Sequence, residues 1–118
     1  MPIKVVSKIE DGVAVITISG KVVGDDSLVM RREITWLVEE MSRNIPPKVI
    51  LDFGDVSEFD NAGLGVLISS YTMVKKREGK LLFVARQGEL TYLLAITKLT
   101  RIFEIFDTVE AAMIVFEI

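Results

Sequence analysis

The chain is 118 residues long, half of them hydrophobic and 26% charged, which is the balance of a single folded domain over residues 1–118 and not of a disordered chain. Its net charge of −3, with no basic run longer than residues 75–77, argues against a nucleic-acid partner, because phosphate backbones demand a sustained positive field. Without cysteine or histidine the chain lacks thiolate metal ligands, disulfides and the usual general base at neutral pH, which argues against catalysis.

The first third of the chain predicts a β-hairpin and then a helix. Two segments rich in Val, Ile and Thr flank Asp11-Gly12, which favours the positive φ angles of a tight turn. Asp25 or Asp26 can cap the helix that follows, and Pro46-Pro47 prevents its continuation. Helical spacing places four residues on the core face of this helix: Met30, Ile34, Leu37 and Met41.

The middle of the chain predicts a buried strand that leads into a capped helix. Residues 48–53 are almost continuously apolar, as expected of a strand covered on both faces, and we place this strand at the sheet centre. Asp60 caps the next helix and Gly79 ends it. We expect the core face of this helix to consist of Leu64, Leu67, Ile68, Tyr71 and Val74.

The remaining segments continue the alternation of strands and helices. After the hairpin, this alternation predicts right-handed crossovers and an α/β fold, with a mixed, mostly parallel central sheet, the first strand antiparallel at an edge, and about four helices. The last helix has β-branched residues that would also suit a strand. The expected elements, in the order β-β-α-β-α-β-α-β-α, span residues 3–9, 13–19, 26–43, 48–53, 61–78, 81–85, 89–99, 102–106 and 108–115.

Four acidic residues gather near the carboxyl end of the predicted central strand, where open α/β sheets bind ligands. Asp52, Asp55, Glu58 and Asp60 are therefore candidates for a magnesium or phosphate site. The alternative is a solvated loop that carries one helix cap, and we favour it because the sequence offers no partner cluster elsewhere. We therefore expect no metal and no cofactor.

Gly63 and Gly65 lie in the first turn of the second helix, where each glycine costs about 1 kcal/mol relative to alanine. The pattern indicates either a close approach by a partner or ligand, or tight packing of the helix on a strand. Because Ile68 occupies the third position of a dinucleotide-binding glycine motif, this pattern supports a phosphate- or nucleotide-binding protein only weakly.

Residues 49–67 resemble the core signature of the STAS family, in which a hydrophobic strand and a Val-Ser-x-x-Asp turn precede Asp-Ser-Ser-Gly-Leu-Gly at the start of a helix. The resemblance continues through residues 94–112. We identify the chain as a STAS-type protein of the anti-sigma factor antagonist branch. Its version of the motif is Asp60-Asn61-Ala62-Gly63-Leu64-Gly65.

The resemblance implies a binding function and a missing switch. Members of this branch bind a kinase-type anti-sigma factor and thereby free a sigma factor, and phosphorylation of the second serine in Asp-Ser-Ser-Gly switches them off. Ala62 occupies that position and Asn61 the preceding one, so neither carries a hydroxyl. We therefore expect a protein-binding module, not an enzyme, which cannot be phosphorylated at this turn.

Helical geometry predicts the partner surface. Val66, Ser70 and Met73 point away from the expected core face of the second helix. Trp36 and Val29 lie off the core face of the first helix, where an exposed Trp could anchor an interface. The alternative is that neighbouring helices cover both strips. The predicted partner-binding residues are Asp60, Asn61, Ala62, Gly63, Leu64, Gly65, Val66, Ser70 and Met73.

Two further functions of the same fold stay open. One is a non-sigma adaptor, such as a stressosome-like scaffold or an accessory subunit of a lipid-transport complex; the other is the phosphate- or nucleotide-binding protein. The N-terminus lacks the apolar core of a signal peptide, and the apolar stretches are too short to cross a membrane. We therefore expect a cytoplasmic protein without membrane insertion, and a homodimer is compatible with the sequence.

Overall fold

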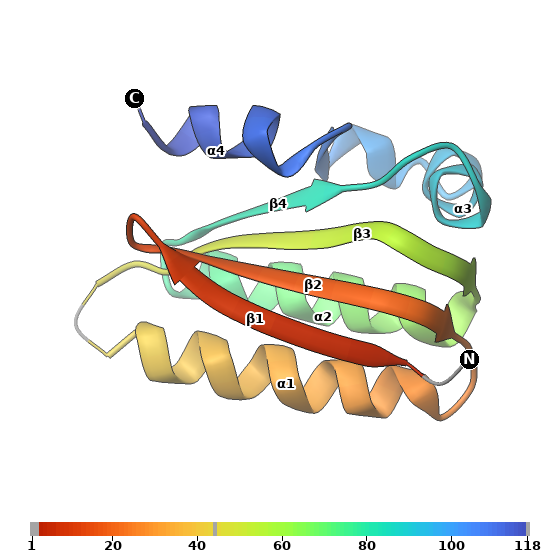
Figure 1. Cartoon of the computed structure of the whole chain (residues 1–118), viewed down its shortest axis with the longest axis horizontal. Coiled ribbons are helices and arrows are strands. Elements are labelled where there is room, and N and C mark those ends of the chain that lie inside the picture. The colour runs from red at the N-terminus through yellow and green to blue at the C-terminus, as the bar shows by residue number, and fades with distance from the viewer. Residues whose placement is uncertain (1–2, 44, 118) are drawn as a thin grey trace.

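The computed structural model describes residues 3–43 and 45–117 and is built around a five-stranded sheet (Figure 1). The first strand runs antiparallel to the second, at one edge, and the others are parallel, as the sequence predicted. Asp11 and Gly12 form the hairpin turn with φ angles of 52° and 79°. In spatial order the strands are β1 (Lys4–Glu10), β2 (Val13–Val22), β3 (Lys48–Phe59), β4 (Lys80–Val84) and β5 (Glu104–Phe106).

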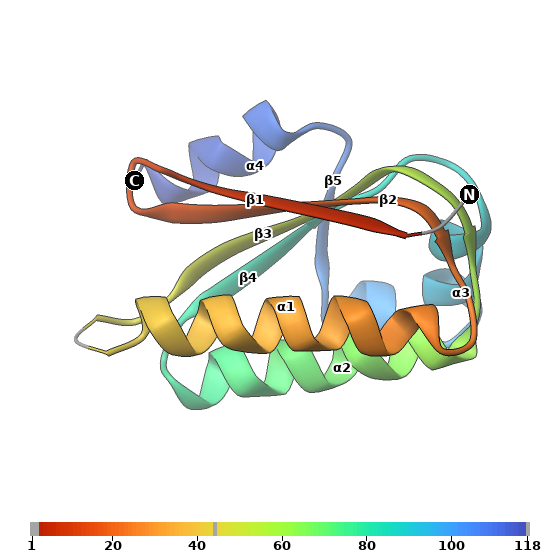
Figure 2. The same cartoon turned by 60° about the horizontal axis from the view of Figure 1, so that its bottom comes forward.

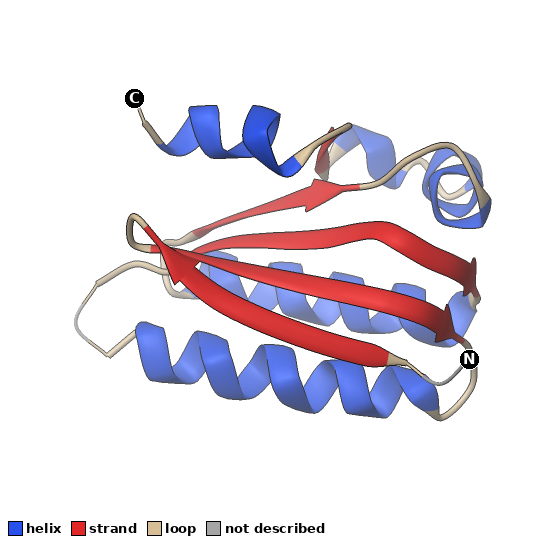
Figure 3. Cartoon of the chain, viewed as in Figure 1, coloured by secondary structure: helices blue, strands red, loops and turns tan. Residues whose placement is uncertain are grey.

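The helices cover the two faces of the sheet unequally. One face carries the two long helices side by side, and α4 lies on the other face (Figures 1 and 2). Figure 3 shows α3 beyond the carboxyl ends of β3 and β4. The helices are α1 (Asp26–Met41), α2 (Asn61–Lys76), α3 (Glu89–Ile96) and α4 (Val109–Phe116), with the short 3-10 helix η1 (Leu99–Arg101) before β5.

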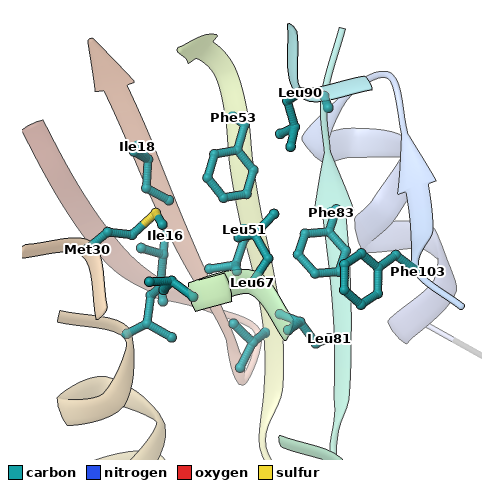
Figure 4. Close-up of a cluster of buried hydrophobic side chains, with 14 of the residues drawn as sticks. Ile16, Ile18, Met30, Leu51, Phe53, Leu67, Leu81, Phe83, Leu90 and Phe103 are labelled. Carbon is teal, nitrogen blue, oxygen red and sulfur yellow. The ribbon is translucent and has the colours of Figure 1, made fainter. Parts of the chain in front are cut away.

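Two hydrophobic clusters hold these layers together. The larger cluster fills the space between the sheet and the long helices, where Leu51, Leu67 and Phe83 are fully buried (Figure 4). The smaller lies under α4 and includes Ile50, Leu82 and Ala112. Because both faces of β3 are buried, the prediction of a central, continuously apolar strand is confirmed.

The buried faces of the long helices differ from the predicted ones. Val38 is fully buried on α1, whereas Leu37 and Met41, which we expected in the core, are half-buried at its edge. On α2, Ile68 is 45% exposed, although we expected it in the core. The reason is that α1 and α2 pack against each other as well as against the sheet, which rotates the buried face of each toward its neighbour.

The bounds of α3 and β5 also differ from the prediction. The α3 helix stops at Ile96, because Lys98 takes a left-handed φ of 62° before the 3-10 helix, and β5 is correspondingly shorter. The last element is a helix, capped by the Thr108 hydroxyl, which accepts the Ala111 N–H at 3.1 Å. In the part of the chain that is described, no helix is long and apolar enough to cross a membrane.

The central strand is longer than expected, and this sets the position of the turn at the start of α2. We predicted a loop after residue 53, but β3 continues to Phe59 by pairing with β2 across two register shifts. Its pairing with β4 ends at Asp52, so the second half of β3 has a strand neighbour on one side only. This overhang carries the end of β3 toward α3 (Figure 1), and Asp60 shares a hollow with Glu89 and Tyr92 of that helix.

Candidate functional site

The candidate site is built on the Asp60 turn, by which we mean residues 60–65 at the start of α2. Asp60 has an extended backbone and caps the helix: its Oδ1 accepts the N–H groups of Ala62 (3.1 Å) and Gly63 (3.3 Å). Its Oδ2 accepts the N–H of Gly24 at 2.8 Å, in the loop between β2 and α1. One carboxylate therefore holds the helix start and a distant loop together, and the predicted cap is confirmed.

These hydrogen bonds keep Asp60 ionised. The Gly24 N–H is the main cause that lowers the pKa of Asp60 below its ordinary value. Burial is the next largest effect and opposes it, and the N–H groups of Gly63 and Ala62 lower the pKa further. The positive end of the α2 dipole lies at the same position and also favours a negative charge. The site thus presents a fixed negative group at its base.

The two glycines of the turn have different roles. A Cβ on Gly63 would lie 2.8 Å from the Phe59 ring and 3.1 Å from Val22 Cγ1, so this glycine lets α2 pack tightly on the end of the sheet. A Cβ on Gly65 would have no atom within 4 Å. Tight packing therefore accounts for Gly63, while Gly65 is exposed and leaves open backbone at the surface.

The turn exposes one side and buries the other. Asn61, Ala62 and Gly65 are exposed, whereas Gly63 and Leu64 are buried against the core. Neither Asn61 nor Ala62 carries a hydroxyl. The first hydroxyl that precedes the turn in the sequence is that of Ser57 on β3, which donates to the Gly20 carbonyl at 3.3 Å.

The exposure that we predicted for the rest of the α2 strip is wrong. Val66 and Ser70 are only 6% and 3% exposed, and Met73 is half-buried. They lie on the side of α2 that faces α1, where a hollow of about 200 Å³ separates the two helices. The side of α2 that solvent reaches carries Ile68 and Thr72 instead.

The acidic residues of β3 do not converge. Asp52 accepts the Gly54 N–H at 2.9 Å, Glu58 lies 3.6 Å from Lys21 Nζ, and Asp60 caps α2. Within residues 3–43 and 45–117, no three acidic side chains gather as metal ligands would. The alternative that we favoured, a solvated loop with one helix cap, is right about the Asp60 cap but wrong about the loop, because Asp55 and Glu58 belong to the paired overhang of β3.

The contribution of α3 to this site was not predicted from the sequence. Glu89 Oε2 accepts the Phe59 N–H at 2.8 Å, and this bond fixes the start of α3 beside the Asp60 turn. Tyr92 is 66% exposed and, with Leu93 and Asn61, lines an open hollow of about 360 Å³ between α3 and the turn. The sequence did carry a signal for this role, because residues 90–96 are almost wholly apolar. A helix that buries only one of its faces would carry more polar residues on the other.

A second exposed aromatic residue lies away from the turn. Trp36 is 61% exposed, as predicted, whereas Val29 is half-buried. At 1.5 Å per residue, Trp36 lies about 15 Å along α1 from Asp26, the first residue of the helix. It lines a shallow hollow of about 380 Å³ with Arg32 and Glu39.

The amino-acid sequence matches a known protein family and two named proteins. The family model described as STAS domain matches residues 4–112. A protein of Thermotoga maritima named "Putative anti-sigma factor antagonist" is 28% identical over 78 residues, which is 66% of this chain and 69% of that protein. Its homologue in Thermotoga neapolitana is 30% identical, also over 78 residues that make up 66% of this chain and 69% of that protein.

Solved structures show the same fold at low identity. The crystal structure of an anti-sigma factor antagonist from Mycobacterium paratuberculosis has a TM-score of 0.83 and 23% identity, and covers 96% of this chain and 92% of that one. The Bacillus cell fate determinant SpoIIAA, in its phosphorylated form, has a TM-score of 0.71 and 14% identity, with 93% and 96% coverage. These neighbours share the architecture in Figure 1.

Proposed function

Because this chain belongs to the STAS domain family, we propose that it is an anti-sigma factor antagonist, which binds a kinase-type anti-sigma factor and thereby frees a sigma factor. The relatives named as such antagonists support the class of function. The observation that carries the proposal is the Asp60 turn, in which one carboxylate fixes the start of α2 and leaves Asn61, Ala62 and Gly65 exposed. The protein acts by binding and performs no catalysis.

The proposed partner surface combines the turn with α3. Asn61 and Ala62 provide small polar and apolar contacts, and Gly65 leaves room for close approach by the partner. Tyr92 provides the large aromatic group that commonly dominates binding energy. Asp60, Gly63 and Leu64 hold this surface from beneath, and Val66, Ser70 and Met73 contribute indirectly, by packing α2 against α1.

We further propose that the antagonist is permanently active at this turn. A phosphoryl group at position 62 would stand beside the Asp60 carboxylate and compete with it for the N–H groups of α2, which would disturb the turn by charge repulsion. Ala62 offers no hydroxyl for that reaction. A kinase-type anti-sigma factor that inactivates serine-bearing antagonists would therefore leave this chain in its binding state.

Binding tests the proposal most directly. The purified chain, titrated with an anti-sigma factor kinase from the same genome, should form a complex that competes with sigma factor. Asn61→Arg should weaken the complex about tenfold or more, as expected for a residue at the centre of an interface. The matched control is Ser7→Arg, an exposed position on edge strand β1. Equal affinities of the two variants would contradict the assignment of this surface.

Phosphorylation tests the missing switch. With the kinase and ATP, the natural chain should stay unmodified, as measured by intact mass, and Ala62→Ser should gain one phosphate and lose affinity for the kinase. Phosphate on Ser57 of the natural chain, with loss of binding, would mean that the switch has moved to another hydroxyl. That outcome would overturn the proposal of permanent activity but leave the binding proposal standing.

One observation favours a second candidate, a non-sigma adaptor such as a stressosome-like scaffold or a lipid-transport accessory subunit. Trp36 presents an exposed aromatic surface on α1, separate from the Asp60 turn, so the domain has a face for a second protein or a second copy of itself. Gel filtration with light scattering distinguishes the candidates, because a scaffold forms large assemblies or homodimers that Trp36→Ser disrupts.

A further inference from the structure

An open groove lies at the end of the sheet opposite the Asp60 turn. It is bounded by the amino ends of β3 and β4 and by the carboxyl ends of α2 and α4, which meet on the left of Figure 1. Its volume of about 840 Å³ is the size of many small-molecule sites, which span about 300–1,000 Å³. Its apolar lining includes Ile45, Pro46, Val115 and Phe116, and its charged lining consists of the three lysines Lys48, Lys75 and Lys80 and one acidic residue, Glu78.

Two of the lysines lie directly opposite each other on neighbouring strands. Lys48 and Lys80 are the first residues of β3 and β4 and are direct partners in the parallel register. Neighbouring strands lie about 4.8 Å apart, and like charges directly opposite each other destabilise a sheet. Side chains alternate along a strand, so both lysines lie on the same face as Ile50, which is the face that α4 covers.

The positive charge in the groove is only partly neutralised. Lys80 Nζ lies 3.2 Å from Glu104 Oε1. No carboxylate in residues 3–43 and 45–117 lies within ion-pair distance of Lys48 or Lys75, and Lys75 Nζ instead lies 6.0 Å from the centre of the Tyr71 ring. An anion held between these lysines would relieve the repulsion of the cross-strand pair.

The apolar part of the groove is preformed. Lys80 N–H donates to the Pro47 carbonyl at 2.9 Å, and a Cβ on Gly79 would lie 2.3 Å from that same oxygen, so the floor is tightly packed. Ile45 is 58% exposed on one wall, and the half-buried Phe116 lies on the other. An apolar surface beside positive charge that is only partly neutralised suits a ligand with a hydrocarbon tail and an anionic head.

We propose that this groove binds a single-chain anionic amphiphile of the fatty-acid type. Its carboxylate would lie between Lys48 and the neighbouring lysines, and its alkyl chain would run along Ile45 and Phe116. A concave groove with apolar walls accommodates one alkyl chain, whereas a flat membrane surface would contact only its rim. The site is independent of the proposed anti-sigma antagonism, which uses the opposite end of the sheet.

The test titrates the full chain with sodium dodecanoate below its micelle concentration, followed by calorimetry and by backbone amide chemical shifts. Saturable one-to-one binding is expected, with shifts concentrated at residues 45–48, 79–80 and 115–116. Lys48→Gln should weaken binding about fivefold, the worth of one charge contact near the surface. Lys4→Gln, at an exposed position on β1, is the matched control and should leave binding unchanged.

Two further measurements distinguish the contributions of the ligand's alkyl tail and of its charged head group to the binding affinity. Ile45→Ser should weaken dodecanoate binding about tenfold while far-UV circular dichroism stays unchanged, since Ile45 is exposed and outside the helices and strands. Dodecyltrimethylammonium, with the same tail and a positive head, should bind at least about tenfold more weakly. Equal binding of the two amphiphiles, shifts mapped elsewhere, no saturation with dodecanoate, or attachment to anionic vesicles alone would each overturn the proposal.

Discussion

The Asp60 carboxylate makes hydrogen bonds whose removal has a calculable cost. In Asp60→Ala, the Ala62 and Gly63 N–H groups lose their cap, and such a change costs about 1 kcal/mol. The bond from Gly24 is lost as well, and a hydrogen bond to a charged group contributes about 1.5 kcal/mol at the low end that suits an exposed pair. We therefore expect the free energy of unfolding to fall by about 2–3 kcal/mol.

The measurement is urea unfolding at pH 7, followed by circular dichroism at 222 nm. Asp25→Ala is the matched control, because Asp25 also precedes a helix but makes no side-chain capping bond, and its cost should stay within about 0.5 kcal/mol. Asp60→Asn keeps an oxygen for the cap but turns an amide toward Gly24, so its cost should be intermediate. If Asp60→Ala cost no more than Asp25→Ala, the structural role assigned to this carboxylate would be refuted.

Acid should remove the same interactions, because the pKa of Asp60 is lowered in the folded state. The stabilisation that its carboxylate gives the fold is complete above the unfolded pKa of about 3.9 and is lost as pH falls through the folded pKa. Asp60→Asn should therefore flatten the dependence of stability on pH in that acid range. Gly63→Ala should destabilise by about 1–3 kcal/mol, through its clash with Phe59, while Gly65→Ala, with open space around it, should stabilise by about 0.5–1 kcal/mol; chemical denaturation measures both. By the same assay, Leu67→Ala should cost about 2–5 kcal/mol and Ile68→Ala much less, and a reversed order would contradict the orientation of α2.

Local patterns in the sequence were sufficient for most of the fold. Three of these patterns depend on only a few neighbouring residues and can be recognised without the rest of the chain: the Asp11-Gly12 turn, the apolar run of β3 and the Asp60 cap. The alternation of strands and helices then leaves few topologies to choose from. The family motif located the candidate site for the same reason, since the motif is contiguous along the chain.

Features that depend on distant neighbours were missed. Helical periodicity treats a helix as if only the sheet covered it, so it placed Ile68 inside and Val66 outside, whereas the α1 neighbour reverses both. Acidic residues suggested a loop where Glu58 and its neighbours in fact pair with β2. The bond between Glu89 and the Phe59 N–H joins elements 30 residues apart, and no local pattern predicts it.

The overhang of β3 leaves one strand edge without a partner, and such edges invite pairing with a foreign chain. The carboxylate of Glu89 takes the Phe59 N–H at the far end of this edge, and the start of α3 stands against the rest of it, around a hollow of about 150 Å³. An incoming strand would meet a helix and a negative charge where it needs a free amide. The arrangement that holds the Asp60 turn beside α3 therefore also protects this strand edge from edge-to-edge aggregation, and loss of the Glu89 side chain should appear first as poorer solubility during refolding.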